Sequence, residues 1–259
     1  MSNNTKEALF SNSIENSTNL SIDDLNKYLP AVQNVDDLIF DKQASGGGVF
    51  YGLGTTGLMK IPENTIDLII TEPPSFPITN LKNKVKTLSI NEYLSWNRKW
   101  IDECFRILKD TGSIYLICDW KISGMYQSIL DQKFKIRTRI SWKNKSKKTS
   151  DNLIWIDKLS DIWFATKSNN YVLNQKDNER AANLWNDVID YKSKENEQLP
   201  KELLKKIVKV SSYKLNWVLD PFCRTGTIGA NAIETGRRFI GFEANKDKLL
   251  LSMKKIDRK

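Results

Sequence analysis

Short apolar runs alternate with amphipathic stretches along most of the chain. The clearest amphipathic stretch runs from Asn91 to Leu108, where apolar side chains recur at steps of three and four residues and predict a helix that Gly112 ends. Other helices are predicted at 21–28, 58–61, 121–132, 200–210, 227–235 and 246–256. Strands are predicted at 49–51, 66–70, 113–118, 136–142, 161–166, 217–219 and 238–242. Strands that alternate with helices predict an α/β protein with one mostly parallel, seven-stranded sheet and helices on both faces.

Outside this pattern, two stretches are polar and irregular. Residues 1–19 are rich in Asn, Ser and Thr and are expected to form a flexible tail. Residues 177–199 are expected to form an irregular connection. The remainder, residues 20–259, is long enough for a single α/β domain.

The composition excludes several kinds of chemistry. The chain has no histidine, so His-based acid–base catalysis and the usual zinc sites are excluded, and no metal is expected. The three cysteines are far apart in sequence, which is typical of free thiols in a reducing compartment. No apolar run is long enough to span a membrane, so we expect a cytoplasmic protein. The net charge of +9 is compatible with a nucleic acid partner, although lysine-rich surfaces are also common on other proteins.

The first candidate site follows the apolar run from Ile66 to Ile70. The chain continues as Thr71-Glu72-Pro73-Pro74-Ser75-Phe76, and two prolines cannot continue a strand because they lack the N–H group and fix φ. They hold the chain rigidly at the carboxyl end of the strand, where open α/β sheets bind ligands. A carboxylate and backbone carbonyls on such a turn suit an amino group. An ordinary strand exit that proline ends is the alternative.

The second candidate site extends from Leu219 to Glu243. A strand leads into a turn that holds Gly226, and a helix begins directly after it, so backbone N–H groups can bind an anionic group. Glu243 ends the next strand and can bind two ribose hydroxyls. This spacing indicates a nucleotide-cofactor site, whereas a plain βαβ unit would need only the glycine turn.

Together, the two stretches resemble the DNA amino-methyltransferases that use S-adenosylmethionine. That family has Asp-Pro-Pro-Tyr after an apolar strand and Asp-Pro-Phe-x-Gly-Ser-Gly-Thr as its cofactor motif, which is similar to residues 220–227 here. Residues 236–243 are similar to its ribose-binding strand. The order of the motifs is that of the β group, whose members modify the amino group of adenine or cytosine in DNA. The resemblance covers about residue 49 to the C-terminus and implies a Rossmann-like methyltransferase fold.

The resemblance also implies roles for individual residues. In the family, the target base is flipped out of the duplex, and the motif's carboxylate and a proline carbonyl accept its amino hydrogens. The corresponding catalytic residues here are Glu72, Pro73, Pro74 and, as the stacking aromatic, Phe76. The corresponding residues around S-adenosylmethionine are Asp220, Phe222, Arg224, Thr225, Gly226, Thr227 and Glu243.

The chain departs from the family pattern at five places in the candidate catalytic and cofactor sites. Glu72 replaces Asp, Ser75 replaces the stacking Tyr, and Arg224 replaces a Gly. Leu53 stands where the family usually has Asp, and residues 196–200 resemble only weakly the family's His-Pro-Thr-Gln-Lys-Pro segment. Because the two motifs lie at neighbouring strand ends, we expect Glu72 and Arg224 to form a salt bridge where cofactor and base would meet.

The most basic stretch begins at residue 143, in a loop over 143–158 that stands where the family contacts DNA. Its lysines are expected to neutralise phosphates, with an ordinary solvated loop as the alternative. These lysines are Lys143, Lys145, Lys147 and Lys148.

Two functions follow from the resemblance and its departures. The departures favour a DNA-binding or partner subunit of a DNA methylation system, with impaired catalysis and with S-adenosylmethionine binding that is weakened or lost. The alternative is an active DNA adenine-N6 or cytosine-N4 methyltransferase. Family members often pair, so a homodimer or a heterodimer with a related subunit is expected, and RNA is a third possible substrate because charge does not distinguish the two polymers.

Overall fold

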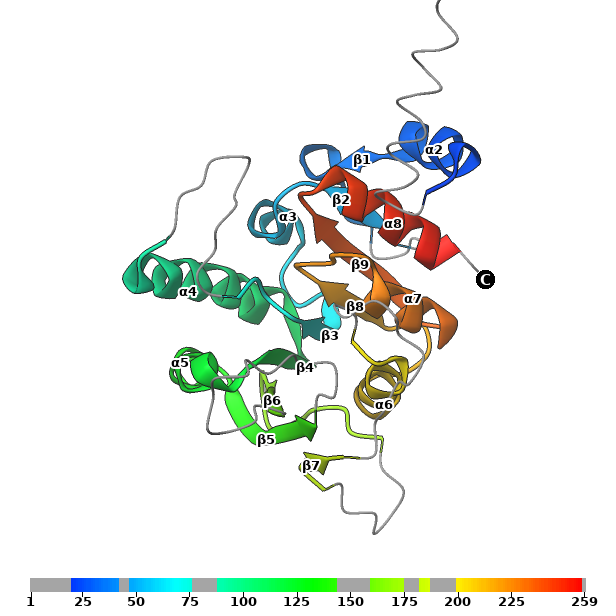
Figure 1. Ribbon diagram of the computed structural model, residues 1–259. Helices are drawn as coiled ribbons and strands as arrows, with labels where there is room; N and C mark the ends of the chain where they lie inside the picture. The colour runs from blue at the N-terminus through cyan, green and yellow to red at the C-terminus, as the bar shows by residue number, and fades with distance from the viewer. Residues whose placement is uncertain are drawn as a thin grey trace, which may run out of the picture.

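A single sheet forms the centre of the molecule in the computed structural model, which describes residues 20–41, 47–75, 88–143, 159–174, 182–186 and 199–257 (Figure 1). Within these residues, nine strands pair in one continuous order. In that order the strands are β1 (Gln33–Asn34), β2 (Val49–Tyr51), β9 (Arg238–Glu243), β8 (Trp217–Asp220), β3 (Ile66–Thr71), β4 (Leu108–Asp119), β6 (Leu159–Thr166), β5 (Lys135–Lys143) and β7 (Leu184–Trp185).

All neighbouring pairs are parallel except the two that β6 makes, with β4 and with β5. The carboxyl ends of β2, β9, β8, β3 and β4 therefore meet at one edge of the sheet. Both candidate sites follow strands of this set, because Glu72 follows β3 and the turn from Pro221 follows β8. Since β3 pairs directly with β8, the topology brings the two sites together.

Helices cover both faces of the sheet, as predicted (Figure 1). One face carries α3 (Gly54–Lys60), α4 (Ile90–Ile107) and α5 (Trp120–Leu130), and the other carries α6 (Lys201–Ser211), α7 (Thr227–Glu234) and α8 (Lys246–Asp257). The helix α2 (Ile22–Tyr28) packs against α8. Two short 3₁₀ helices, Leu29–Ala31 and Val35–Asp37, follow α2.

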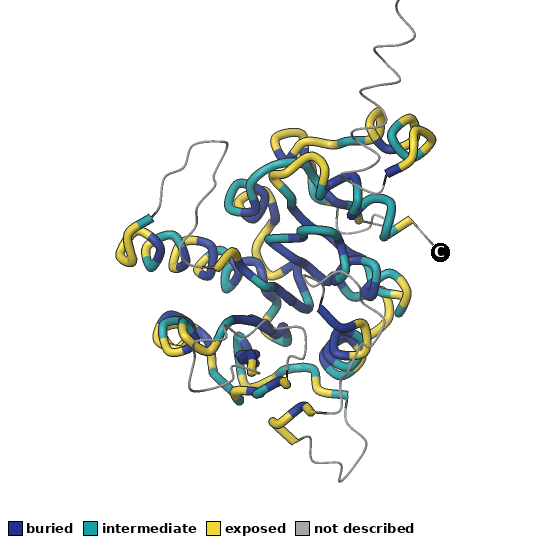
Figure 2. Tube along the Cα trace, in the orientation of Figure 1, coloured by how far each residue is buried: buried dark blue, intermediate teal, exposed yellow. Residues whose placement is uncertain are grey.

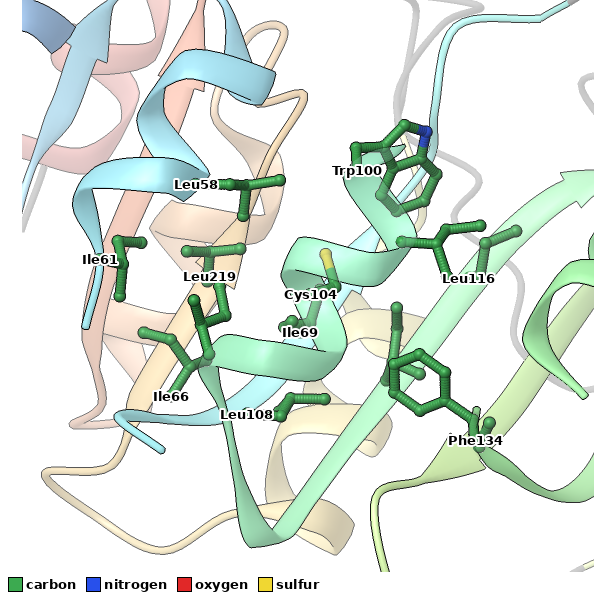
Figure 3. Packing of buried hydrophobic residues seen from close by; sticks show 14 of the residues in the cluster. Leu58, Ile61, Ile66, Ile69, Trp100, Cys104, Leu108, Leu116, Phe134 and Leu219 are labelled. Carbon is green, nitrogen blue, oxygen red and sulfur yellow. The ribbon is translucent and has the colours of Figure 1, made fainter. Parts of the chain in front are cut away.

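The longest helix, α4, shows why the apolar pattern predicted the core well. Ser89 begins it with a capping box, in which the Ser89 hydroxyl accepts from the Glu92 backbone N–H and the Glu92 carboxylate accepts from the Ser89 backbone N–H. Trp100, Cys104 and Ile107 then face the sheet and are fully buried. Figure 3 shows Trp100 and Cys104 packing among side chains of β3, β4, β8 and α3. The sheet is buried along most of its length, and exposed positions lie mainly on the outer helix faces (Figure 2).

Two details of the prediction were wrong. The sheet has nine strands in the described part of the chain instead of seven, because β1 and β7 add one short strand at each edge. Each has only two residues, which is too short for an alternating pattern. Gly112 does not end a helix, since α4 ends at Ile107 and the chain passes directly into β4. Gly112 lies instead at an irregularity of β4, where a Cβ atom would lie 2.9 Å from the Lys109 carbonyl oxygen.

The helix before β3 is also longer than expected, since α3 covers 54–60 and not only the final turn. The predicted flexible tail at 1–19 lies outside the described residues, as does most of the irregular connection at 177–199. Among the helices that the structure describes, none combines the length and apolar character that crossing a membrane requires.

Candidate functional site

The Glu-Pro-Pro turn, Glu72–Ser75, leaves the carboxyl end of β3 and is fixed by a buried hydroxyl chain. The Tyr93 hydroxyl of α4 donates to the Pro74 carbonyl oxygen at 2.8 Å, and the Tyr126 hydroxyl of α5 lies 2.9 Å from that of Tyr93. Burial raises the pKa of both tyrosines, so both hydroxyls keep their protons. This role of Tyr93 was not predicted from the sequence, because a hydrogen bond to a distant turn leaves no periodic signal. Phe76 lies outside the described residues.

The glycine turn, Pro221–Gly226, follows β8 and leads into α7. Asp220 at the end of β8 is 1% exposed and accepts from the Phe222 backbone N–H at 3.0 Å. Burial raises the pKa of the Asp220 carboxyl to about 7, against the opposing effects of that hydrogen bond and of the Arg224 charge. Gly226 has φ of 77°, a left-handed conformation that glycine adopts without cost. A Cβ atom at Gly226 would also lie 2.7 Å from the Ser252 side chain, so the turn requires glycine here.

Glu243 ends β9 beside the glycine turn, with both carboxylate oxygens oriented by backbone donors. Its Oε2 accepts from the Arg224 N–H and its Oε1 accepts from the Asn245 N–H, each at 2.8 Å. Burial raises the pKa of the Glu243 carboxyl, although the two N–H donors oppose this effect. Each carboxylate oxygen has a second lone pair, so this side chain can still accept from hydroxyl groups of a ligand.

Arg224 links the two turns. Its Nη1 lies 2.5 Å from Oε2 of Glu72, and both side chains are 35% exposed. The predicted salt bridge between Glu72 and Arg224 is therefore confirmed. Arg224 also has φ of 50°, which is a left-handed conformation that strongly favours glycine. The position thus keeps the backbone geometry of a glycine, while its side chain extends across to the Glu-Pro-Pro turn.

A pocket between the two turns brings together most of the predicted site residues. It encloses about 300 Å³ of space free of protein atoms, part of it open to solvent. Its lining consists of Glu72, Leu199, Asp220, Phe222, Cys223, Arg224, Thr225, Thr227 and Ile228. Gly226 and Glu243 do not line this pocket, and Glu243 is linked to it through the hydrogen bond from the Arg224 N–H.

Three lining residues were missed by the sequence analysis. Leu199 precedes α6 and Ile228 lies inside α7, and both belong to the apolar pattern of the core. Cys223 is buried, and burial raises the pKa of its thiol well above the ordinary value.

Lys255 of α8 was also missed, and it holds the hydroxyls of the glycine turn. Its Nζ lies 3.2 Å from Oγ1 of Thr225 and 3.2 Å from Oγ1 of Thr227. A basic residue in the last turn of a helix is ordinarily explained by the helix dipole, so its sequence position gave no sign of this contact.

Leu53 lies at the same edge of the sheet, at the start of α3. It occupies the N-cap position and its side chain makes no capping hydrogen bond. The next residue, Gly54, packs so closely on the glycine turn that a Cβ atom would lie 2.0 Å from the Pro221 carbonyl oxygen. The backbone of this segment is therefore fitted to the site although Leu53 provides no polar group.

The predicted nucleic acid contacts lie only partly within the described residues. Lys143 is exposed at the end of β5, while Lys145, Lys147, Lys148 and the rest of the basic loop lie outside them. The part of the chain that the structure describes contains no group of three or more Cys, Asp or Glu side chains arranged to hold a metal ion.

Comparison with known proteins agrees with this geometry. Residues 66–254 match the family model described as DNA methylase. Over 241 residues the chain is 26% identical to the DNA adenine methyltransferase YhdJ of Escherichia coli strain K12, covering 81% of this chain and 82% of that protein.

Two solved structures share the fold. The PvuII cytosine-N4-specific DNA methyltransferase superposes with a TM-score of 0.69 at 19% identity, over 82% of this chain and 86% of that one. M1.HpyAVI in complex with SAM superposes with a TM-score of 0.62 at 20% identity, over 81% of this chain and 98% of that one. The expected Rossmann-like methyltransferase fold is therefore confirmed.

Proposed function

Because this chain belongs to the DNA methylase family, we propose that it binds DNA within a methylation system while its own methyl transfer is suppressed. The observation that supports the suppression is the 2.5 Å contact between Arg224 and Glu72. Glu72 is the residue that would accept a hydrogen of the target amino group, and here a guanidinium group already donates to it. An acceptor held by a positive charge is a weaker partner for that hydrogen.

The cofactor end of the pocket fits S-adenosylmethionine only in part. Glu243 is oriented to accept from two ribose hydroxyls, and Gly226 provides the turn at the start of α7. S-adenosylmethionine supplies an electrophilic methyl group on a positively charged sulfonium. Arg224 places a second positive charge and a long side chain beside Glu72, where that group would lie. The ribose end of the site therefore fits the cofactor and the methyl end does not.

Binding of DNA is supported by charge and by family membership. The chain carries a net charge of +9, and Lys143 is exposed at the carboxyl edge of the sheet, at the start of the most basic stretch. Lysines in this position would neutralise phosphates and make the affinity strongly dependent on salt. A related subunit that lacks this ion pair would supply the catalysis that Arg224 suppresses.

The proposal is tested by measuring DNA binding and methyl transfer on the same preparation. We expect the purified chain to bind a duplex oligonucleotide with an affinity that falls steeply with salt, and to incorporate no labelled methyl group into it. Adding the proteins that co-purify with it is expected to restore incorporation. Sustained turnover by the purified chain would overturn the suppression, and absence of DNA binding at low salt would overturn the proposed function as a whole.

The retained half of the cofactor site favours a second candidate, an active DNA amino-methyltransferase. Asp220, Gly226 and Glu243 keep the geometry described above, and they are the residues that the family resemblance places around the cofactor. Calorimetric titration with S-adenosylmethionine separates the two candidates. Binding in the micromolar range would favour the active enzyme, whereas no measurable binding would favour the suppressed one.

A further inference from the structure

Trp120 differs from every other tryptophan in the part of the chain that the structure describes. Seven of the eight tryptophans fall in this part, and Trp120 is the only exposed one, with 52% of its surface accessible. Five of the others are buried and Trp96 is partly buried against the core. A large aromatic ring that is exposed to solvent is available to stack on a ligand.

The strand order places Trp120 and the Glu-Pro-Pro turn at the same edge of the sheet, after neighbouring strands. Thr71 of β3 pairs with Leu116 of β4 in a parallel register. β4 continues to Asp119 and Trp120 begins α5 directly after it, while the Glu-Pro-Pro turn begins directly after Thr71. Trp120 and the turn therefore follow the carboxyl ends of two neighbouring parallel strands.

Hydrogen bonds between tyrosine side chains and the backbone also link α5 to the Glu-Pro-Pro turn. Trp120 begins α5, and Tyr126 of the same helix contacts Tyr93, which in turn donates to the Pro74 carbonyl. α5 is thereby tied to the Glu-Pro-Pro turn by buried hydrogen bonds. α4 and α5, which contribute these hydroxyls, lie side by side on the same face of the sheet (Figure 1).

We propose that Trp120 supplies the ring that stacks on an unpaired base held at the Glu-Pro-Pro turn. The inference rests on the proposed function, because it assumes that the bound polymer is DNA. Ser75 has no ring to cover a base whose amino group faces Glu72, and Trp120 is the exposed ring that follows the neighbouring strand in the described part of the chain. Stacking on an aromatic ring is tolerant of base identity, so the ring would hold adenine or cytosine alike.

The surroundings of Trp120 suit a nucleotide. Lys121 is exposed next to it, and Asp119, Ser160 and Trp142 lie in one row across β4, β6 and β5. Lys143 follows Trp142 in β5, so it extends from the same edge of the sheet as Trp120 does. An aromatic ring with exposed lysines at the same edge of the sheet suits single-stranded nucleic acid, because the ring can stack on a base while the lysines neutralise phosphates.

The test is an anisotropy titration of a labelled single-stranded DNA oligonucleotide with the full chain and its variants. W120A is expected to weaken binding about 5- to 100-fold, which corresponds to the loss of one stacked base, and W120F is expected to retain most of the affinity. W120L separates stacking from simple apolar contact, since it should weaken binding as W120A does. The salt dependence of W120A should equal that of the wild type, because no phosphate contact is lost, whereas K143A should reduce the salt slope by about one.

Two further variants serve as controls. Tyr213 is 58% exposed but lies just before β8, at the opposite edge of the sheet, so Y213A should bind as the wild type does. F76A tests the aromatic residue that the family resemblance favours. Loss of binding in F76A with retention in W120A would overturn the inference, as would equal affinity of W120A and wild type.

A wild-type chain that binds neither single-stranded nor duplex DNA would overturn the proposed function. Wild-type binding to duplex DNA, with no effect of W120A on the single strand, would overturn this inference alone. Thermal melting of W120A should match the wild type, since the ring that is removed is exposed.

Discussion

Replacing Arg224 with glycine separates the backbone of the glycine turn from the side chain that reaches Glu72. The substitution removes the guanidinium group from the pocket and leaves the backbone at φ of 50°, which glycine adopts freely. If the side chain suppresses the site, Arg224→Gly should change ligand binding much more than it changes stability.

The expected magnitudes follow from the geometry. A non-glycine residue in the left-handed region costs about 1 kcal/mol, which the substitution recovers. Both side chains of the ion pair are 35% exposed to solvent, so its loss costs no more than about 1 kcal/mol. These contributions nearly cancel, and the free energy of unfolding should stay within about 1 kcal/mol of the wild type. Cofactor binding no longer has to break the pair, so the Kd for S-adenosylmethionine should fall about fivefold or more.

The assay combines urea unfolding with calorimetric titration of S-adenosylmethionine. Leu215→Gly is the matched control, because Leu215 also has a positive φ, of 66°, and is 66% exposed, but does not line the pocket. Its free energy of unfolding should rise because glycine adopts a positive φ without cost, and its affinity for S-adenosylmethionine should not change. The reasoning is refuted if Arg224→Gly binds S-adenosylmethionine no better than the wild type while Leu215→Gly behaves as expected.

Three further substitutions test other parts of the site by urea unfolding. The pKa of Asp220 is raised from 3.8 to about 7 in the folded chain, so the folded state holds a proton that the unfolded state releases. The free energy of unfolding of the wild type should therefore fall by up to about 4 kcal/mol as the pH rises from about 4 to 7. Asp220→Asn should remove this pH dependence, and an unchanged dependence would contradict the prediction. Gly54→Ala should cost about 1–3 kcal/mol because the new methyl group meets the Pro221 carbonyl at 2.0 Å, whereas Gly48→Ala, with nothing within 4 Å, should not; equal effects would contradict the close packing. Tyr93→Phe should cost about 1–3 kcal/mol by leaving its buried hydrogen-bond partners unsatisfied, and an unaltered unfolding midpoint would show that the Glu-Pro-Pro turn is held otherwise.

The regular elements were predictable where one face of an element is buried. The helix expected at 91–108 is observed as α4, because burial of every third or fourth residue produces both the pattern and the helix. The edge strands β1 and β7 were not predictable, since each has only two residues, too few to show an alternating pattern. Gly112 was misread because a glycine after a helix usually ends it, whereas here it serves an irregularity within β4.

The candidate site was predictable where strand order alone brings residues together. Glu72 and Arg224 follow neighbouring parallel strands, so their contact could be expected from the strand order alone. Contacts made by side chains of the surrounding helices could not be expected. Tyr93 holding the Pro74 carbonyl and Lys255 holding the threonine hydroxyls depend on how α4 and α8 pack, which the periodicity of the sequence does not specify.

The central claim is that the Arg224 side chain, and not loss of the fold, suppresses methyl transfer. The most direct measurement is incorporation of labelled methyl groups into DNA by the wild type and by Arg224→Gly, under identical conditions and with S-adenosylmethionine in excess. The account predicts no incorporation above background for the wild type and measurable incorporation for Arg224→Gly, because Glu72 is then able to accept an amino hydrogen. Many methyl groups transferred per wild-type chain would contradict it.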